Sequence, residues 1–219
     1  MNKPRSAYPS AESVVLLVTD AGGLLPIEGV VFGFSGSRIL VRVPSTEALL
    51  PGADLVILRR AGSGQQYARG IACDVRESEV AVEVAGGWQN ADRRHQERFP
   101  AWIPAVVEFE RSGRPVANTA VVVDVSMGGL AAETSSWHGG ETVTLTLRWR
   151  DSSCRFDCRV VSVGPAWRGA LVHCRFEGLT PEQRAWLEKL IGSLQRTFRQ
   201  AQRFLFSRAD DPQSVASTG

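Results

Sequence analysis

Apolar and polar residues alternate in short runs along most of this chain. Residues Glu79–Val84 show the pattern in its simplest form, because every second side chain is valine and the others are glutamate or alanine. A period of two predicts a β-strand with one buried face. Similar short runs, separated by turn residues, lie at Val14–Val18, Gly29–Phe34, Arg38–Val43, Asp54–Arg59 and Tyr67–Arg76. Six short strands between residues 13 and 85 predict an N-terminal β-barrel domain.

A second series of strands begins at Phe99. Apolar residues alternate with polar ones in Ile103–Phe109, Val121–Val125, Val143–Trp149, Cys154–Val160 and Ala170–Phe176. In the second run we expect Val121, Val123 and Val125 to share the buried face. The apolar phase slips between Val160 and Val161, which predicts a β-bulge. Because no helical pattern interrupts these strands, they predict a second antiparallel barrel.

The pattern changes to a helical one after residue 180. Thr180 is a good N-cap residue, and Pro181 suits the first helical turn. Apolar residues then recur at helical spacing, at Leu187, Leu190, Ile191, Leu194 and Phe198. We expect a helix from Pro181 to about Phe206, with its first half packed on the second barrel. Its basic second half fits a dimer contact, a membrane surface or a protein partner, and an oligomer or partner contact is favoured.

These patterns predict an all-β fold with a C-terminal helix, built from two antiparallel β-barrel domains in tandem. Residues 1–12 are expected to be a disordered leader and residues 208–219 a disordered tail. Residues 86–98 are expected to form a connector, because the strand pattern stops at Ala85 in a segment with two glycines. The second domain, residues 99–207, then includes the helix.

Composition narrows the function classes. The 219 residues carry a net charge of only +2, so no global field points to DNA, RNA or a membrane. No apolar run approaches the ~20 residues of a membrane span, and a cytoplasmic protein is expected. The four cysteines form no C-x-x-C pair, and Cys158 and Cys174 fall on the apolar phase of strands. No metal site, cofactor or catalytic group is expected, so the chain is not predicted to be an enzyme.

Two short strings carry candidate chemistry. Arg94 and Arg98 form an R-x-x-x-R string, and Asp124, Ser126 and Gly129 form a D-x-S-x-x-G string that occurs once. Further R-x-x-x-R strings occur at Arg38/Arg42, Arg155/Arg159 and Arg199/Arg203. Only the pair at Arg94 and Arg98 ends a polar connector and precedes a strand that leads into the second string.

The residue types suit a guanine nucleotide. A guanidinium can bind phosphate oxygens or the O6/N7 edge of guanine, while the Asp124 carboxylate can accept hydrogen bonds from the base. Ser126 can donate or accept, and Gly128 and Gly129 allow a turn with positive φ close to a ligand. A purely structural interpretation is also open, with the arginines in a surface charge cluster and Asp124 and Ser126 capping a turn.

The two strings together resemble those of the PilZ family, over a region from Arg93 to the helix. The chain is similar to PilZ proteins of the flagellar-brake type, which have an N-terminal barrel, a connector with R-x-x-x-R and a C-terminal PilZ barrel. The resemblance implies a receptor for cyclic di-GMP that regulates motility, secretion or envelope polysaccharide. It implies that Arg94, Arg98, Asp124, Ser126, Gly128 and Gly129 bind the ligand.

The resemblance also implies that Arg93 influences whether one cyclic di-GMP or a stacked pair binds. The alternative for Arg93 is an ordinary surface arginine. The alternative for the whole protein is a PilZ adapter that binds a protein partner without the dinucleotide.

Overall fold

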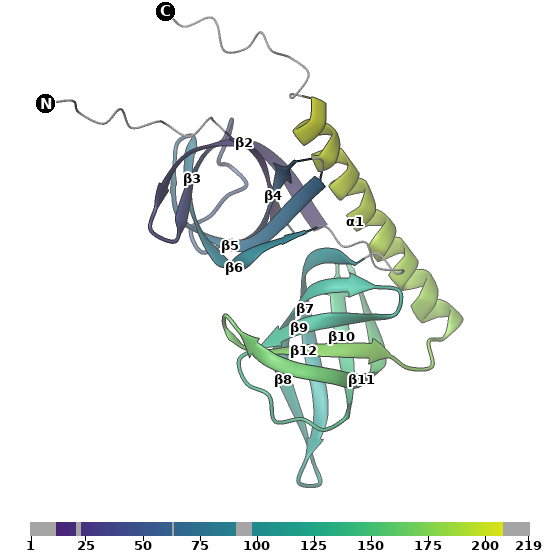
Figure 1. Cartoon of the computed structure of the whole chain (residues 1–219). Helices are drawn as coiled ribbons and strands as arrows, with labels where there is room; N and C mark the ends of the chain where they lie inside the picture. Colours follow the sequence, from purple (N-terminus) through teal and green to yellow (C-terminus); the bar gives the residue numbers. More distant parts are fainter. Residues whose placement is uncertain (1–11, 21–22, 63, 91–97, 208–219) are drawn as a thin grey trace, which may run out of the picture. The chain divides into compact units, whose positions relative to one another are not determined.

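The computed structural model describes residues 12–20, 23–62, 64–90 and 98–207 of the 219. In that part of the chain it shows two closed six-stranded antiparallel barrels and one helix (Figure 1). The predicted fold class is therefore confirmed. The chain divides into two compact units, one around each barrel.

The first barrel has the strand order β1-β2-β3-β6-β5-β4. Its strands are β1 (Glu12–Asp20), β2 (Gly23–Ser35), β3 (Arg38–Arg42), β4 (Asp54–Ala61), β5 (Gly64–Arg76) and β6 (Glu79–Asn90). Alternate apolar side chains fill its interior, where Leu16, Ile57 and Val82 are fully buried. Every strand predicted in this region is present, and most are longer than their apolar runs.

The end of β6 differs from the prediction. Residues 86–90, which were expected to begin the connector, continue the strand and pair with β5. Polar and aromatic contacts hold them, because the Tyr67 hydroxyl donates to Gln89 Oε1 at 2.7 Å and the Arg59 guanidinium lies 3.9 Å from the centre of the Trp88 ring. The partner residues lie on β5 and β4, so this part of β6 is held without the apolar alternation by which the other strands were predicted.

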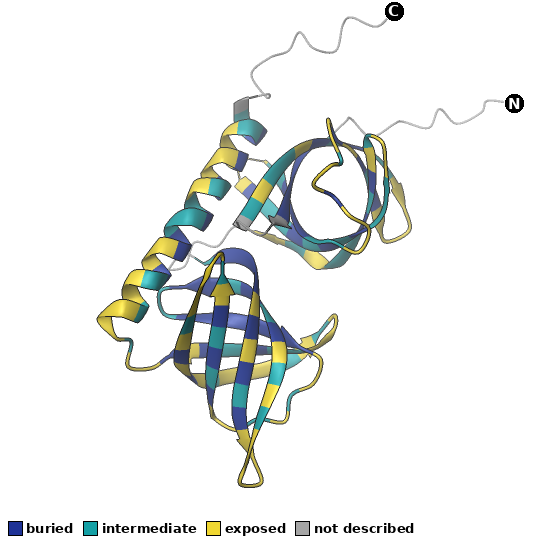
Figure 2. Ribbon diagram, turned by 180° about the vertical axis from the view of Figure 1, so that it is seen from behind, coloured by how far each residue is buried: buried dark blue, intermediate teal, exposed yellow. Residues whose placement is uncertain are grey.

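The second barrel has the strand order β10-β11-β12-β9-β8-β7. Its strands are β7 (Phe99–Arg111), β8 (Arg114–Ser126), β9 (Gly129–Thr134), β10 (Thr142–Trp149), β11 (Ser152–Ala166) and β12 (Gly169–Phe176). Buried and more exposed residues alternate along most of them (Figure 2), whereas every residue of β9 is buried. Leu130 and Phe156 are fully buried. The register of β11 shifts between Val160 and Ser162, so the predicted bulge is confirmed.

The helix α1 spans Pro181–Ser207 and begins as predicted. The Gln183 backbone N–H donates to Thr180 Oγ1 at 3.2 Å, and the Thr180 N–H donates to Gln183 Oε1 at 2.8 Å. These reciprocal bonds form a capping box at the N-terminus. Leu187 and Leu190 are fully buried, and the helix as far as Phe198 belongs to the unit of the second barrel.

From Arg199 onward, α1 belongs to the unit of the first barrel. There Ala201 and Leu205 are buried, and Gln202 Nε2 donates to Gln65 Oε1 at 2.8 Å. The apolar side of this half is therefore covered within the chain, and the expected oligomer or partner contact is left to its exposed arginines. No helix in the described ranges contains a stretch that is long and apolar enough to cross a membrane.

Candidate functional site

The described residues of the two strings lie at one end of the second barrel. Arg98 directly precedes β7, and Asp124 lies near the end of β8. The register pairs Phe99 with Val125 and Pro100 with Asp124, so the start of β7 lies beside the end of β8. Strand pairing therefore brings Arg98 to the turn that carries the second string.

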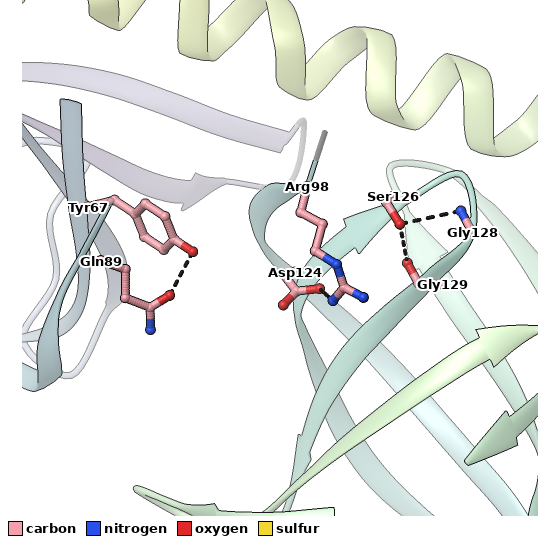
Figure 3. A network of polar contacts seen from close by, with 7 residues as sticks. All are labelled: Tyr67, Gln89, Arg98, Asp124, Ser126, Gly128 and Gly129. Atoms are coloured by element: carbon pink, nitrogen blue, oxygen red, sulfur yellow. Dashed lines mark hydrogen bonds and ion pairs between the residues drawn. The ribbon is translucent and has the colours of Figure 1, made fainter. Parts of the chain in front are cut away.

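An ion pair joins the two strings directly. Arg98 Nη1 donates to Asp124 Oδ1 at 2.8 Å, although the residues are 26 positions apart (Figure 3). The two side chains are 29% and 23% exposed, so the pair is partly shielded and still open to solvent. A guanidinium has five N–H donors, so Arg98 can hold Asp124 and bind an anion at the same time.

Two register shifts flank Asp124. One lies between Val122 and Asp124 on the β9 side, and another lies between Pro100 and Ile103 on the β7 side. Bulges at the rim of a barrel commonly redirect a side chain. Here the irregularity is at Val123, next to the carboxylate that pairs with Arg98.

The bulge also corrects the predicted phase of β8. Val122 and Val125 are fully buried, whereas Val123 packs with Trp102 and Ala131 in a separate cluster against which Val121 lies. Val121, Val123 and Val125 therefore do not share one face. The run of three valines at residues 121–123 allows either phase, and only the pairing with β7 and β9 selects one.

The rest of the second string forms the β8–β9 turn. Ser126 is 2% exposed, its Oγ donates to the Gly129 carbonyl at 3.1 Å, and it accepts from the Gly128 N–H at 3.3 Å (Figure 3). Its hydroxyl therefore holds the turn in shape. This is the capped turn of the structural interpretation, and it coexists with the Arg98–Asp124 pair.

Gly129 is required for a different reason from the one expected. Neither Gly128 nor Gly129 is among the described residues with positive φ, so the expectation of left-handed backbone is wrong. A Cβ at Gly129 would instead overlap the carbonyl oxygen of Cys174 on β12. Glycine at this position thus allows close packing of β9 on β12.

The predicted site residues Arg93 and Arg94 lie outside the described residues. The R-x-x-x-R string on the first barrel has structural contacts of its own. Arg38 pairs with Glu83 at 3.8 Å and Arg42 with Glu79 at 3.1 Å on the first barrel. These two arginines are therefore engaged on their own sheet.

A groove of about 580 Å³ lies on the second barrel, and none of the predicted site residues lines it. Glu108, Glu110, Asp157 and Glu177 line it with a single arginine, Arg155. Its charge is unfavourable for an anionic nucleotide. The described residues also contain no group of three His, Cys, Asp or Glu side chains arranged to hold a metal ion.

Two cysteines of the second barrel, Cys158 and Cys174, are core residues, as predicted. Cys158 and Cys174 are free thiols, 1% and 3% exposed. Burial raises the pKa of Cys174 to about 12, and burial together with the nearby Cys174 raises the pKa of Cys158 well above its usual range. Such thiols stay neutral and unreactive at physiological pH.

Comparison with known proteins identifies one family. Residues 92–193 match the model of the PilZ domain. No curated protein sequence matches the chain.

Several solved structures resemble the chain at low identity. YcgR from Escherichia coli, in complex with c-di-GMP, shares 15% identity with a TM-score of 0.43, covering 92% of this chain and 91% of its own. The K. pneumonia MrkH–c-di-GMP complex shares 13% identity with a TM-score of 0.41, covering 86% and 89%. The inhibitor of motility MotI/DgrA of Bacillus subtilis shares 12% with a TM-score of 0.36, covering 86% and 95%.

Proposed function

Because the chain is a PilZ-domain protein, with that domain at residues 92–193, we propose that it is a non-catalytic receptor for cyclic di-GMP. The observation that carries the proposal is the Arg98–Asp124 ion pair, which joins the R-x-x-x-R and D-x-S-x-x-G strings at one end of the second barrel. The pair places a fixed cation and a carboxylate side by side, which suits a ligand with both phosphates and guanine N–H donors.

Some of these residues would contact the ligand, and the others would hold the β8–β9 turn in shape. Arg94 and Arg98 take phosphates and a guanine, and Asp124 holds Arg98 while its carboxylate can also accept from a base. Ser126, Gly128 and Gly129 keep the turn compact, so that its backbone lies close to the ligand. Arg93 supplies a further positive charge, which favours a second, stacked dinucleotide.

The proposed output depends on the segment between the barrels. Strand β6 holds the chain on the first barrel as far as Asn90, and Arg98 is held on the second by Asp124. Ligand contacts to Arg94 would restrict the residues between these two points, at a conformational cost of roughly 1–2 kcal/mol per residue. A narrower set of domain orientations would then alter contact with a protein partner in motility, secretion or envelope polysaccharide output.

Titration calorimetry of the full chain with cyclic di-GMP tests the proposal, with cyclic di-AMP as the control ligand. We expect binding of cyclic di-GMP alone, because adenine lacks the O6 acceptor of guanine. Arg98→Ala should weaken binding, whereas the matched variant Arg38→Ala should not. If the wild-type chain does not bind, the protein is instead an adapter that works without the dinucleotide. Equal losses in both variants would mean that the wrong arginine string has been assigned.

A further inference from the structure

Two arginines face each other on the outside of the second barrel. Arg159 on β11 pairs directly with Arg175 on β12, and both side chains are exposed. Like charges in directly opposite positions of a sheet are destabilising. Within the part of the chain that the structure describes, neither arginine forms an ion pair or a side-chain hydrogen bond. Among the described residues, the fold therefore keeps an unfavourable pair of positive charges that no ion pair neutralises.

The position of the pair relates it to the candidate site. Arg175 is the register partner of Gly129, and Gly129 is the partner of Ser126. Across the strand order β7-β8-β9-β12-β11, the β8–β9 turn thus has Arg98 on one side and Arg175 with Arg159 on the other. Neighbouring strands are about 4.8 Å apart, so Arg175 lies roughly 14 Å from Arg98 in strand spacing.

The first half of β9, between them, is buried but carries only small side chains on its outer face. Gly129 has no side chain, and the next residue of β9 that follows it on the same face, Ala131, is covered by the Trp102 and Val123 cluster. No bulky side chain of β9 therefore projects between Arg98 and Arg175. A flat anionic ligand at the turn can reach both.

Carboxylates mark where this positive surface ends. Asp157 lies two residues from Arg159 on β11, and Glu177 lies two residues from Arg175, just after the end of β12. Both acids line the acidic groove. Asp157 accepts a hydrogen bond from the Thr144 hydroxyl at 3.0 Å. Neither acid forms an ion pair with the two arginines among the described contacts, so the arginines keep their capacity for an external anion.

We propose that Arg159 and Arg175 form a second anion-binding patch, which takes a phosphate of the dinucleotide held at Arg98 and the β8–β9 turn. The inference rests on the proposed function. An incoming phosphate would relieve the repulsion between the two guanidinium groups and accept their paired N–H donors. The patch thereby extends the ligand site across β9, β12 and β11, beyond the two sequence strings.

The test compares two double variants in calorimetric titrations with cyclic di-GMP. R159Q/R175Q removes the patch. R111Q/R114Q is the matched control, because Arg111 and Arg114 are also exposed and directly opposite each other, at the other end of β8. That end is about 40 Å from Ser126 at ~3.3 Å per residue, far beyond the Debye length of about 8 Å.

We expect R159Q/R175Q to raise the Kd for cyclic di-GMP by about five- to fiftyfold, and to reduce the dependence of Kd on salt. The control should stay within about twofold of the wild type. The Tm of R159Q/R175Q without ligand should be unchanged or higher, because a like-charge pair is removed. If its Tm falls, the single variants R159Q and R175Q provide the same comparison in a folded protein.

The outcomes separate the two proposals. A wild type that binds, with R159Q/R175Q within twofold of it, overturns the second patch and leaves the receptor function standing. Equal weakening in R159Q/R175Q and the control also overturns it, since the effect would then be one of overall charge. A wild type that does not bind cyclic di-GMP overturns the receptor function, and the patch with it.

Discussion

The Arg98–Asp124 ion pair predicts a large effect on ligand binding and a small effect on stability. Its N–O distance of 2.8 Å is short, but both side chains remain 29% and 23% exposed. Ion pairs this open to solvent contribute about 1 kcal/mol or less to folding. Charge-assisted hydrogen bonds to a bound ligand contribute roughly 1.5–3 kcal/mol each. Arg98→Ala should therefore weaken cyclic di-GMP binding by about ten- to 150-fold, while the Tm changes by only a few degrees.

A double-mutant cycle measures whether the two residues act together. The assay is titration calorimetry on the wild type, Arg98→Ala, Asp124→Ala and the double variant, with thermal melts of all four. Because Asp124 holds Arg98, the loss in the double variant should be smaller than the sum of the single losses, by about 1 kcal/mol or more. Arg38→Ala is the control, since Arg38 is ion-paired with Glu83 on the first barrel.

Two results would refute this reasoning. Binding by Arg98→Ala within twofold of the wild type would exclude Arg98 as a ligand contact. Strictly additive losses would show that Asp124 does not act through Arg98, even if both residues touch the ligand.

Three further predictions concern other residues. Arg93→Leu should reduce the number of cyclic di-GMP molecules bound per chain from two toward one in calorimetry, and an unchanged ratio would make Arg93 ordinary surface charge. Ligand should slow hydrogen exchange at residues 91–98 but not in the core strand β10. Residues 86–90 are already paired in β6 and should be protected without ligand. Unchanged exchange at residues 91–98 on adding ligand would refute the proposed restriction of the domain orientations. Burial raises the pKa of the Cys158 and Cys174 thiols, so above pH 9 these thiols ionise in the unfolded chain but stay neutral in the folded one. The free energy of unfolding should therefore keep its full contribution from the two thiols below pH 9 and lose it as the pH rises toward about 12. At pH 10 the loss should be about 1.4 kcal/mol per thiol, measured by urea unfolding against a Cys158→Ala/Cys174→Ala variant, and equal pH dependence in both proteins would contradict it.

Much of the architecture could be predicted from the sequence because it follows from local burial. A strand with one face in a barrel core needs alternate apolar residues, so the runs around Leu16 and Leu145 identify their strands. The phase slip at Val160 has the same cause, since a bulge shifts every later side chain to the other face. The start of α1 is equally local, because Thr180 and Gln183 are only three residues apart and satisfy each other's backbone groups.

The candidate site depended on tertiary structure wherever its contacts cross strands. The partners of Gln89 and Trp88 lie on β4 and β5, so the extension of β6 has no local signature. Gly129 is needed because of the Cys174 carbonyl on another strand, which its own neighbours in sequence do not reveal.

The choice among the arginines shows most clearly what local sequence determines and what tertiary structure decides. The sequence contains several R-x-x-x-R strings, and it favours Arg94 and Arg98 by their order and setting without showing which arginine contacts Asp124. Only barrel closure and the register of β7 on β8 bring Arg98 to Asp124 across 26 residues, while Arg38 and Arg42 are paired with glutamates on the first barrel. Local pattern determines which segments form strands because each strand must bury one face. Which charged side chains meet is decided by strand order and register, which are properties of the whole sheet.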